Sequence, residues 1–479
     1  ILSQKFSFHQ LLSFVLKSVI LNLNQTLWQI TKIPIFCREC MSKQILHIGI
    51  DDTDSPKGMC TTFLAYKIIN RLKKENVDFL DFPNLVRFNP NIPWKTRGNG
   101  AVGIKISTSN PEKIKNLVKK FVKQYSDVKN GANPGLVFCQ DENIPDEFLK
   151  ISSDAMWKLI HRNKAKKILS KYNFDFFYLG NGQGLVGATS VIGYNFQDQT
   201  YELLSYRKSS QFGKKRSIDK SKVKEMQEKT YPNTFNSFDS KKNKVLLMPH
   251  GPDPVFYGVR GEDSSTLISA SKMIKPKEKL AGYLIFKSNQ GTGDHLKNEI
   301  DVNNFLPYTS GTLQGIVSTK PIVTKGGHVF FSVVVNNVKV HCAVYKPTRI
   351  TNIAKELIIG DMIKLGGGIR KASKTHPRIL NIEFIQILKL EKKSKLINPF
   401  CKKCKKNMKS KGKNQGFQCV KCKKSSPHKI RQFFTRSIKE QIYVPDTSAH
   451  RHLTKPVQRM KQKSKHEKFD PNSSWITNF

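Results

Sequence analysis

The chain has 479 residues, and its 82 Lys and Arg outnumber its 36 Asp and Glu, which gives a formal net charge of +46. A chain of this length is expected to form three or four domains, which excludes a single small module. The positive charge favours a polyanionic partner, with nucleic acid ahead of an anionic membrane surface.

The N-terminal residues 1–40 are expected to lie outside the fold. The chain starts at Ile1, and its first methionine is Met41. The apolar stretch 11–23 is broken by Lys17 and is too short to span a bilayer, and no small-residue cleavage pattern follows it. We interpret it as an upstream extension, with a docking extension as the alternative. No other stretch approaches a transmembrane helix, so a cytoplasmic protein without a membrane partner is expected.

Three carboxylates follow the first strand-like segment, residues 45–50. Asp51, Asp52 and Asp54 lie between this apolar segment and a helix-like segment over 63–72. Carboxylate oxygens suit Mg²⁺, which usually takes one or two protein carboxylates and leaves its other positions to water and phosphate. The loop therefore predicts a site for Mg²⁺ and phosphate. The alternative is an acidic turn that caps the helix.

Gly58 and Thr61 complete this loop. Glycine lets the backbone come close to a ligand, and the free amides that open the next helix near Thr61 favour anions. No Gly-x-x-x-x-Gly-Lys-Ser/Thr sequence occurs in the chain. We therefore predict a nucleoside triphosphate site that is not a Walker loop.

Residues 85–100 form the next polar loop, with three cations, three asparagines and two glycines between strand-like runs. This mixture suits a loop that meets phosphate or a base. The stretches 181–188, 250–262 and 288–295 are interpreted as further loops of the same site. For each of them, ordinary turn chemistry is the alternative.

Residues 312–390 have the rhythm of a small β-barrel. Alternating apolar runs predict five strands, and a helix-like segment over 352–359 falls between the third and the fourth. This is the order of an OB-fold, which commonly binds single-stranded nucleic acid through a basic groove and stacking aromatics. Phe330, Phe331 and Tyr345 are candidate stackers, with barrel core as the alternative. The expected strands cover 313–317, 328–335, 338–345, 361–365 and 379–388.

Four cysteines have the spacing of a Cys₄ zinc ribbon: Cys401, Cys404, Cys419 and Cys422. Each Cys-x-x-Cys turn presents two thiolates to one side, and two turns complete a tetrahedron. The site is expected to be structural, because four cysteines leave no open position for catalysis. A pair of disulfides is the alternative, which a reducing compartment disfavours.

The C-terminal end is predicted to be the basic surface that contacts nucleic acid. Residues 391–479 hold 24 Lys or Arg and 5 Asp or Glu, a net charge of +19 in under a fifth of the chain. Such a local excess is typical of a surface that meets nucleic acid.

From Met41 to about Pro456 the sequence resembles the archaeal family of isoleucine tRNA 2-agmatinylcytidine (agmatidine) synthetases. Many long motifs in the same order carry the resemblance. They are Ile-Gly-Ile-Asp-Asp-Thr-Asp-Ser (48–55), Gly-Met-Cys-Thr-Thr (58–62), Asn-Pro-Asn-Ile-Pro-Trp-Lys-Thr-Arg-Gly-Asn-Gly (89–100), Pro-His-Gly-Pro-Asp-Pro-Val (249–255), Ser-Asn-Gln-Gly-Thr (288–292) and the zinc ribbon.

The resemblance implies a multidomain α+β protein. The family combines a kinase-like α/β catalytic domain, a ferredoxin-like domain, an OB-fold β-barrel and a C-terminal zinc ribbon. On this chain the domains are expected at 41–198 (ATP-binding, kinase-like), 199–305 (ferredoxin-like), 306–392 (OB-fold) and 393–430 (zinc ribbon), followed by a basic tail at 431–479.

The resemblance also implies a reaction and its partners. Such enzymes use ATP to activate the C2 carbonyl oxygen of the wobble cytidine in the CAU-anticodon isoleucine tRNA, and the primary amine of agmatine then displaces that oxygen. AMP and diphosphate are released, and the modified tRNA decodes AUA. The implied cofactors are ATP, Mg²⁺ and structural Zn²⁺, and no obligate protein partner is inferred.

The family's functional residues map onto the acidic loop. Asp51, Asp52 and Asp54 would hold Mg²⁺ and the phosphates, and Thr61 matches the family's autophosphorylated threonine. Side-chain type suggests further roles. Lys95 and Arg97 would neutralise phosphate charge, Asn99 would orient a ligand, Gly58 would admit the nucleotide, and Asp253 would bind the agmatine guanidinium.

Two other functions remain open on the sequence alone. A non-catalytic single-strand binding protein, built on the barrel and the ribbon, would leave the motif 51–62 without a role. A kinase-like enzyme for another small molecule would leave the basic C-terminal region unexplained.

Overall fold

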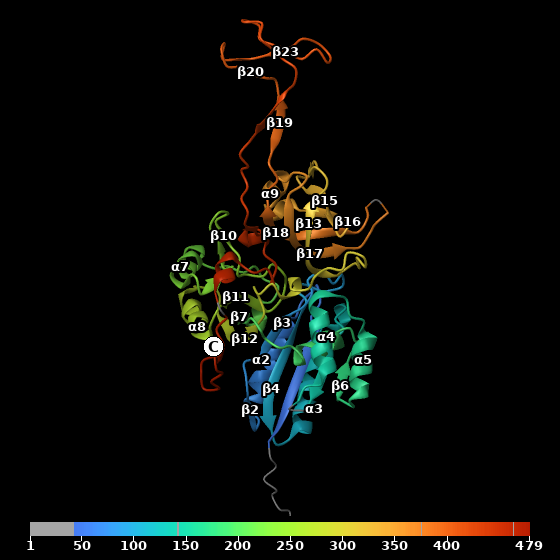
Figure 1. The fold of residues 1–479 in the computed structure, drawn as a ribbon. Helices are drawn as coiled ribbons and strands as arrows, with labels where there is room; N and C mark the ends of the chain where they lie inside the picture. The colour runs from blue at the N-terminus through green and yellow to red at the C-terminus, as the bar shows by residue number, and fades with distance from the viewer. Residues whose placement is uncertain (1–42, 141–142, 375, 463) are drawn as a thin grey trace, which may run out of the picture. The chain divides into compact units, whose positions relative to one another are not determined.

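A sheet of eleven strands organises the first three hundred residues (Figure 1). No helix in the described part of the chain is long and apolar enough to cross a membrane. The predicted upstream extension at 1–40 lies outside the described residues. The structure, a computed structural model, describes residues 43–140, 143–374, 376–462 and 464–479.

Ten strands of this sheet come from the first and the second predicted domains, and β27 comes from the predicted C-terminal tail. Their order is β6-β5-β1-β4-β3-β12-β7-β11-β8, with β2 beside β4 and β27 beside β12. β3 and β12 pair in parallel at Asn84–Leu85 and Lys287–Ser288, so the two regions share one continuous sheet. The bounds are β1 Gln44–Asp51, β2 Val77–Phe79, β3 Asn84–Arg87, β4 Gly100–Thr108, β5 Gly135–Cys139, β6 Phe176–Tyr178, β7 Thr200–Arg207, β8 Thr234–Phe235, β11 Val255–Gly261, β12 Leu280–Ser288 and β27 Ile476–Asn478.

Helices cover both faces of the sheet. The apolar residues of α2 and α3 belong to one buried cluster with those of α7 and α8, and the apolar residues of α4, α5 and α6 belong to another. α3 begins at Pro111 because Asn110 accepts a hydrogen bond from the Lys113 amide at 3.0 Å. The bounds are α2 Thr61–Leu72, α3 Pro111–Tyr125, α4 Asp146–Trp157, α5 Arg162–Lys171, α6 Leu185–Ile192, α7 Lys220–Thr230 and α8 Ser264–Met273, and a small hairpin pairs β9 Phe238–Asp239 with β10 Lys244–Val245.

A closed five-stranded barrel follows, as the alternating pattern predicts. Its strands run in the order β13-β17-β18-β16-β15, and β15 pairs with β13 to close the barrel. Helix α9 lies between β16 and β17, the expected place, but covers only Thr351–Lys355. The bounds are β13 Ser310–Val317, β14 Ile322–Val323, β15 Val329–Val335, β16 Val338–Val344, β17 Met362–Arg370 and β18 Ile379–Lys389.

The candidate stacking aromatics of the barrel divide into core and surface. Phe331 is buried in the barrel core, so it is unavailable to a base, while Phe330 and Tyr345 are half-buried. The Tyr345 hydroxyl donates to the Asn381 side chain at 3.3 Å.

The cysteine-bearing segment is built from short strands. β19 leads the chain into this segment and β25 leads it out, and the two strands pair with each other. The apolar cluster inside it is small, and contains Met408 and Phe417 beside the cysteines. So small a core needs a further constraint to be stable. The bounds are β19 Ser394–Ile397, β20 Phe400–Cys401, β21 Lys406–Asn407, β22 Lys409–Ser410, β23 Phe417–Gln418, β24 Ser425–Ser426 and β25 Ile430–Phe433.

The C-terminal segment packs against both sheets. β26 Ile442–Tyr443 pairs with β18 of the barrel, and β27 pairs with β12 of the large sheet. Beside β27, the Trp475 ring is 1% exposed and packs against Phe79 and Phe469. The residues predicted as a basic tail therefore contribute to the core of the fold.

Trp475→Ala should lower the free energy of unfolding by about 3–5 kcal/mol, the usual cost of truncating a buried large aromatic. Urea unfolding followed by circular dichroism measures this change. Phe479→Ala, at a ring that is 66% exposed, is the matched control and should cost less than about 1 kcal/mol. Equal stability of the two variants would contradict a packed C-terminal segment.

Candidate active site and metal centre

The acidic loop begins where β1 leaves the sheet, and α6 is packed tightly against it. A β-carbon at Gly187 of α6 would lie 1.9 Å from Asp51 Oδ2, and one at Gly184 would lie 2.7 Å from the Asp51 carbonyl oxygen. Only glycine fits at such approaches. The stretch 181–188 therefore does pack on this loop, as the sequence predicts.

Burial, reinforced by mutual repulsion, dominates the electrostatics of the acidic loop. Burial, reinforced by the charges of Asp52 and Asp54, raises the pKa of Asp51 well above its usual range. Burial and the Asp54 charge raise the pKa of Asp52 to about 7. Anionic oxygens forced together in this way form a donor set that fits a hard divalent cation, because the cation would offset the repulsion.

The start of α2 lies beside the acidic loop. The Thr61 hydroxyl is buried and accepts a hydrogen bond from the Thr53 hydroxyl at 3.0 Å. Gly58 and Ser55 form an isolated antiparallel β-bridge. A β-carbon at Gly58 would meet no atom within 4 Å. The loop thus places Thr61 at the helix N-terminus, as predicted, but gives Gly58 no steric requirement for glycine.

Arg97 connects the acidic loop to Asp253. Its guanidinium donates to Asp54 Oδ2 at 2.7 Å and to the Met59 carbonyl oxygen at 2.5 Å, and it lies 3.2 Å from Asp253 Oδ2. Asp253 is 3% exposed, and its other oxygen lies 3.5 Å from the Arg216 guanidinium. The Asp253 carboxylate therefore already lies between two guanidinium groups.

The other two polar residues of this loop make weaker contacts. Lys95 is exposed, and its ammonium donates to the Ile92 carbonyl oxygen at 3.3 Å. The Asn99 amide donates to the Asn89 carbonyl oxygen at 3.0 Å. Asn89 in turn donates to the Tyr308 carbonyl oxygen just before the barrel, so this loop also joins the large sheet to the barrel.

Two pockets meet at the acidic loop. The first encloses about 720 Å³ and brings together most of the predicted polar residues. It also includes Lys158 at the end of α4, which no sequence motif marks. The predicted residues that line it are Asp51, Asp52, Asp54, Lys95 and Asn99.

The second pocket encloses about 960 Å³ and shares Asp54, Gly98 and Gly100 with the first. Of the predicted residues, Thr61, Arg97 and Asp253 line it with Asp54. Sequence reasoning missed two of its polar residues, Glu202 of β7 and His452 of the C-terminal segment. Arg87 of β3 and Arg260 of β11, which also line it, belong to the predicted polar stretches 85–100 and 250–262.

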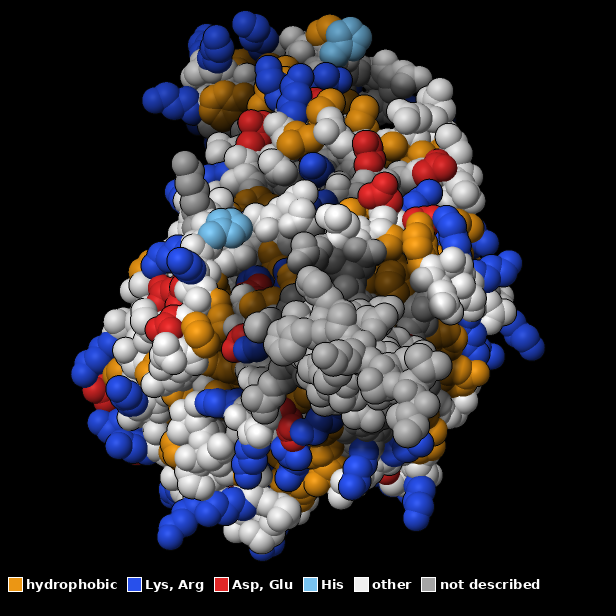
Figure 2. All heavy atoms as spheres, turned by 90° about the horizontal axis from the view of Figure 1, so that it is seen from below, with side chains coloured by type: hydrophobic (Ala, Val, Ile, Leu, Met, Phe, Trp, Pro, Cys, Tyr) orange, Lys and Arg blue, Asp and Glu red, His pale blue; other side chains and the backbone are white. Residues whose placement is uncertain are grey.

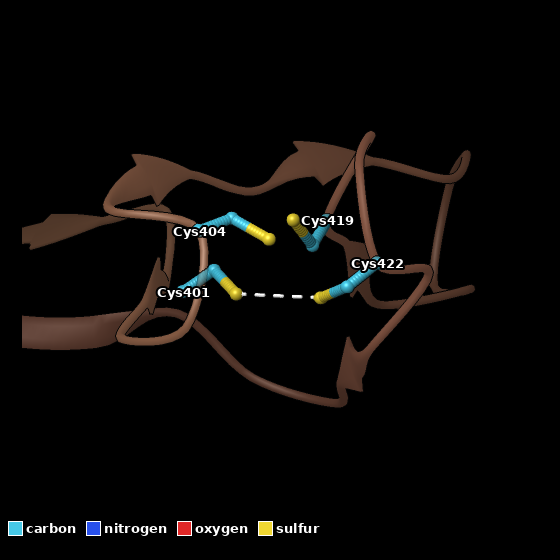
Figure 3. Close-up of side chains that lie close together, drawn as sticks. All are labelled: Cys401, Cys404, Cys419 and Cys422. Carbon is cyan, nitrogen blue, oxygen red and sulfur yellow. Dashed lines mark hydrogen bonds between the residues drawn. The ribbon is translucent and has the colours of Figure 1, made fainter.

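The four ribbon cysteines converge on one point (Figure 3). Their sulfur atoms all lie within 4.8 Å of one another, and Cys401 Sγ lies 3.5 Å from Cys422 Sγ. Backbone amides of Cys422 and Lys421 lower the pKa of the Cys419 thiol to about 6, which favours the thiolate that binds zinc. The set fits one tetrahedral Zn²⁺, and the sulfurs are too far apart for the alternative disulfides.

Sequence models of three domains match the chain. They are the TiaS TCKD domain over residues 47–115, the TiaS FLD domain over 182–295 and the TiaS C-terminal zinc ribbon domain over 398–438. The matched ranges include the acidic loop, Asp253 and all four ribbon cysteines.

Named relatives and solved structures match over almost their whole length. The isoleucine tRNA 2-agmatinylcytidine synthetase TiaS of Cenarchaeum symbiosum (strain A) is 46% identical over 90% of this chain and 96% of its own. The crystal structure of a complex of TiaS with its isoleucine tRNA and ATP matches with a TM-score of 0.80 at 33% identity, over 89% of this chain and 100% of that one. The crystal structure of a complex of TiaS with the same tRNA, AMPCPP and agmatine matches with a TM-score of 0.78 at 31% identity over the same shares.

Cys419→Ser should remove one equivalent of zinc, because three thiolates hold the ion less tightly than four. Elemental analysis of the purified protein measures the zinc content. Cys60→Ser, outside the cluster, is the control and should keep that equivalent. Unchanged zinc in the Cys419 variant would contradict the site.

Proposed function

The chain belongs to the TiaS family of isoleucine tRNA 2-agmatinylcytidine synthetases, and we propose that it uses ATP to attach agmatine to the wobble cytidine of the CAU-anticodon isoleucine tRNA. The amine would bond to C2 of the base, with release of AMP and diphosphate. The observation that carries the proposal is the meeting of two pockets at the acidic loop, since the reaction needs a nucleotide and an amine beside one base.

ATP would bind in the first pocket, with its phosphates near the acidic loop. Asp51, Asp52 and Asp54 would hold Mg²⁺, which when bound neutralises phosphate charge. Lys95 is exposed at the rim and can turn toward a phosphate. Arg97 would reach one only by exchanging an ion pair with Asp54 or Asp253.

Thr61, Asn99 and Gly58 have supporting roles in the proposal. Thr61 is the first residue of α2, where the free backbone amides favour a phosphoryl group. This position suits the autophosphorylation that the family carries out on the matching threonine. Asn99 lines the first pocket and would orient the nucleotide or the base. Gly58 would leave room for the phosphates, since nothing lies within 4 Å of its missing β-carbon.

Agmatine would bind in the second pocket, with its guanidinium at Asp253. This carboxylate is buried and already accepts the Val255 amide at 3.0 Å, so its position is fixed. The agmatine guanidinium would have to displace Arg97 or Arg216 from it. Such an exchange would make agmatine binding depend on the same arginine that holds Asp54.

The tRNA would lie against the barrel and the zinc ribbon. All ten lysines within residues 401–424 are exposed, and they can meet phosphates. Figure 2 shows Lys and Arg side chains spread over the visible face rather than gathered in one patch. Because its lysines are exposed, the ribbon is the favoured contact. Residues 41–198, 199–305 and 306–392 would act as kinase-like, ferredoxin-like and OB-fold domains.

We propose a cytoplasmic location, because the proposed substrate is a tRNA. A non-catalytic binding protein is not favoured, because its role would leave unexplained why three carboxylates are held together against their repulsion. The remaining alternative, a kinase for another small molecule, turns over ATP without tRNA.

The decisive experiment measures AMP release from radiolabelled ATP, with agmatine and the CAU-anticodon isoleucine tRNA added separately and together. Mass analysis of the tRNA runs in parallel. Release only with both, and a tRNA heavier by agmatine less one water, is expected. Turnover without tRNA would support the small-molecule kinase, and no turnover would support the binding protein.

In the same assay, Asp52→Asn should reduce product formation by about a thousandfold or more, because the metal-phosphate site loses a charge. Binding of tRNA should persist. Asp146→Asn, at an exposed carboxylate on α4, is the matched control and should keep full activity. Normal activity of the Asp52 variant would remove the acidic loop from catalysis.

Asp253→Asn should raise the KM for agmatine at least about tenfold, because a charge-assisted guanidinium contact is lost. The KM for ATP should change less. Steady-state kinetics with each substrate varied in turn separates the two effects. An unchanged KM for agmatine would place the guanidinium elsewhere in the second pocket.

A further inference from the structure

The motif 288–292 anchors the C-terminal segment at the second pocket. The amide of Gly291 donates to the His452 carbonyl oxygen at 2.8 Å, and the amide of Gly293 donates to the Leu453 carbonyl oxygen at 2.8 Å. Arg459 adds a buried ion pair with Glu262 at 2.5 Å. These contacts hold His452 in the wall of the second pocket. In sequence, the nearest other residue that lines this pocket is Arg260, 192 positions away.

The shortest hydrogen bond of His452 favours one tautomer of its ring. The Gln290 amide nitrogen donates to the Glu202 carboxylate, so the Gln290 carbonyl oxygen faces His452 Nδ1, 2.9 Å away. An oxygen can only accept, and Nδ1 therefore carries the hydrogen. The Arg260 guanidinium, which can only donate, lies farther from Nδ1 at 3.3 Å and makes no hydrogen bond to it in this tautomer. This leaves the lone pair of the neutral ring on Nε2.

The Nε2 atom lies at the loop shared by the two pockets. A β-carbon at Gly98 would lie 2.9 Å from it, and Gly98 lines both pockets. Within the described chain, Nε2 makes no hydrogen bond. Burial, with the nearby Arg87 and Arg260 charges, holds the pKa of His452 well below its usual range, so the lone pair is free at neutral pH.

The other proton acceptors of the second pocket are occupied. Glu202 pairs with Arg260 at 2.9 Å, and Asp54 pairs with Arg97. Asp253 lies between two guanidinium groups. Among the described residues that line this pocket, the imidazole is thus the base without an ion pair.

We propose that Nε2 of His452 accepts the proton that the agmatine nitrogen loses when it bonds to C2 of the cytidine. The C–N bond forms, the C2–O bond breaks, and the oxygen leaves with the bonding electrons on its phosphoryl group. The amine enters uncharged, because the surrounding guanidinium groups disfavour an ammonium ion. The proton passes to Nε2 and at once to solvent, because burial and the Arg87 and Arg260 charges also disfavour the imidazolium ion. This inference rests on the proposed function and extends it to a catalytic residue from the C-terminal segment.

The test compares 2-agmatinylcytidine formation by the wild type, His452→Asn and His450→Gln, under single-turnover conditions. The Asn amide can still donate to Gln290 in the place of Nδ1, but it cannot take up a proton. A loss of about 100-fold or more in rate is expected, the usual range for general-base catalysis. His450 lies two residues away with both ring nitrogens hydrogen-bonded, so His450→Gln is the matched control and should stay within about threefold of the wild type.

A second variant, His452→Gly, opens space for free imidazole. Added imidazole should restore at least a tenth of the wild-type rate, and thermal melting reports whether each variant is folded. A folded His452→Asn variant with the wild-type rate, or a folded His452→Gly variant that imidazole does not rescue, would overturn the inference. Absence of product from the wild type would instead overturn the proposed function.

Discussion

The carboxylates at the end of β1 are the constraint around which the site is built. Burial and mutual repulsion raise the pKa of Asp51 and Asp52, so holding them together costs free energy without a counter-charge. Arg97 pairs with Asp54 and supplies only part of that charge. The glycines of α6 keep the loop in place from behind. A metal ion bound with the nucleotide would neutralise the remaining negative charge of the carboxylates. Ligand binding would therefore stabilise the folded loop.

The continuous sheet explains how distant motifs reach this loop. Parallel pairing of β3 with β12 puts the ends of these strands side by side, so the loops 88–100 and 288–295 leave the sheet together. Gln290 then reaches Glu202 on β7, and Asn289 donates to the Arg87 carbonyl oxygen at 3.0 Å. Two motifs that the sequence marks separately, 89–100 and 288–292, are thus brought together by hydrogen bonds to β3 and β7 beside the second pocket.

The sequence predicted those parts of the structure whose geometry depends on residues close together in the chain. The alternating runs of the barrel and the paired Cys-x-x-Cys turns carry their own geometry, and both predictions are confirmed in outline. The packing of residues 431–479 could not be predicted, because a mostly polar segment gives no sign of the strands it will join. Glu202 and His452 were missed for a related reason, since each is a single polar residue whose partners are remote in sequence. The ion pairing of Asp253 likewise depends on Arg97 and Arg216, which lie on other elements.

The shared wall of Asp54, Gly98 and Gly100 limits how the proposed reaction can proceed. Activation of the cytidine oxygen needs the nucleotide on one side of the base, and displacement needs the amine on the other, so that the bond that forms and the bond that breaks do not compete for space. In the proposed function, a base placed over this wall would have one pocket on each side. Gly98 and Gly100 keep the wall thin, because a β-carbon at either would come within 2.9 Å of a neighbouring side chain. Under that proposal, positioning of the nucleotide and the amine by the two pockets would be the main source of catalysis.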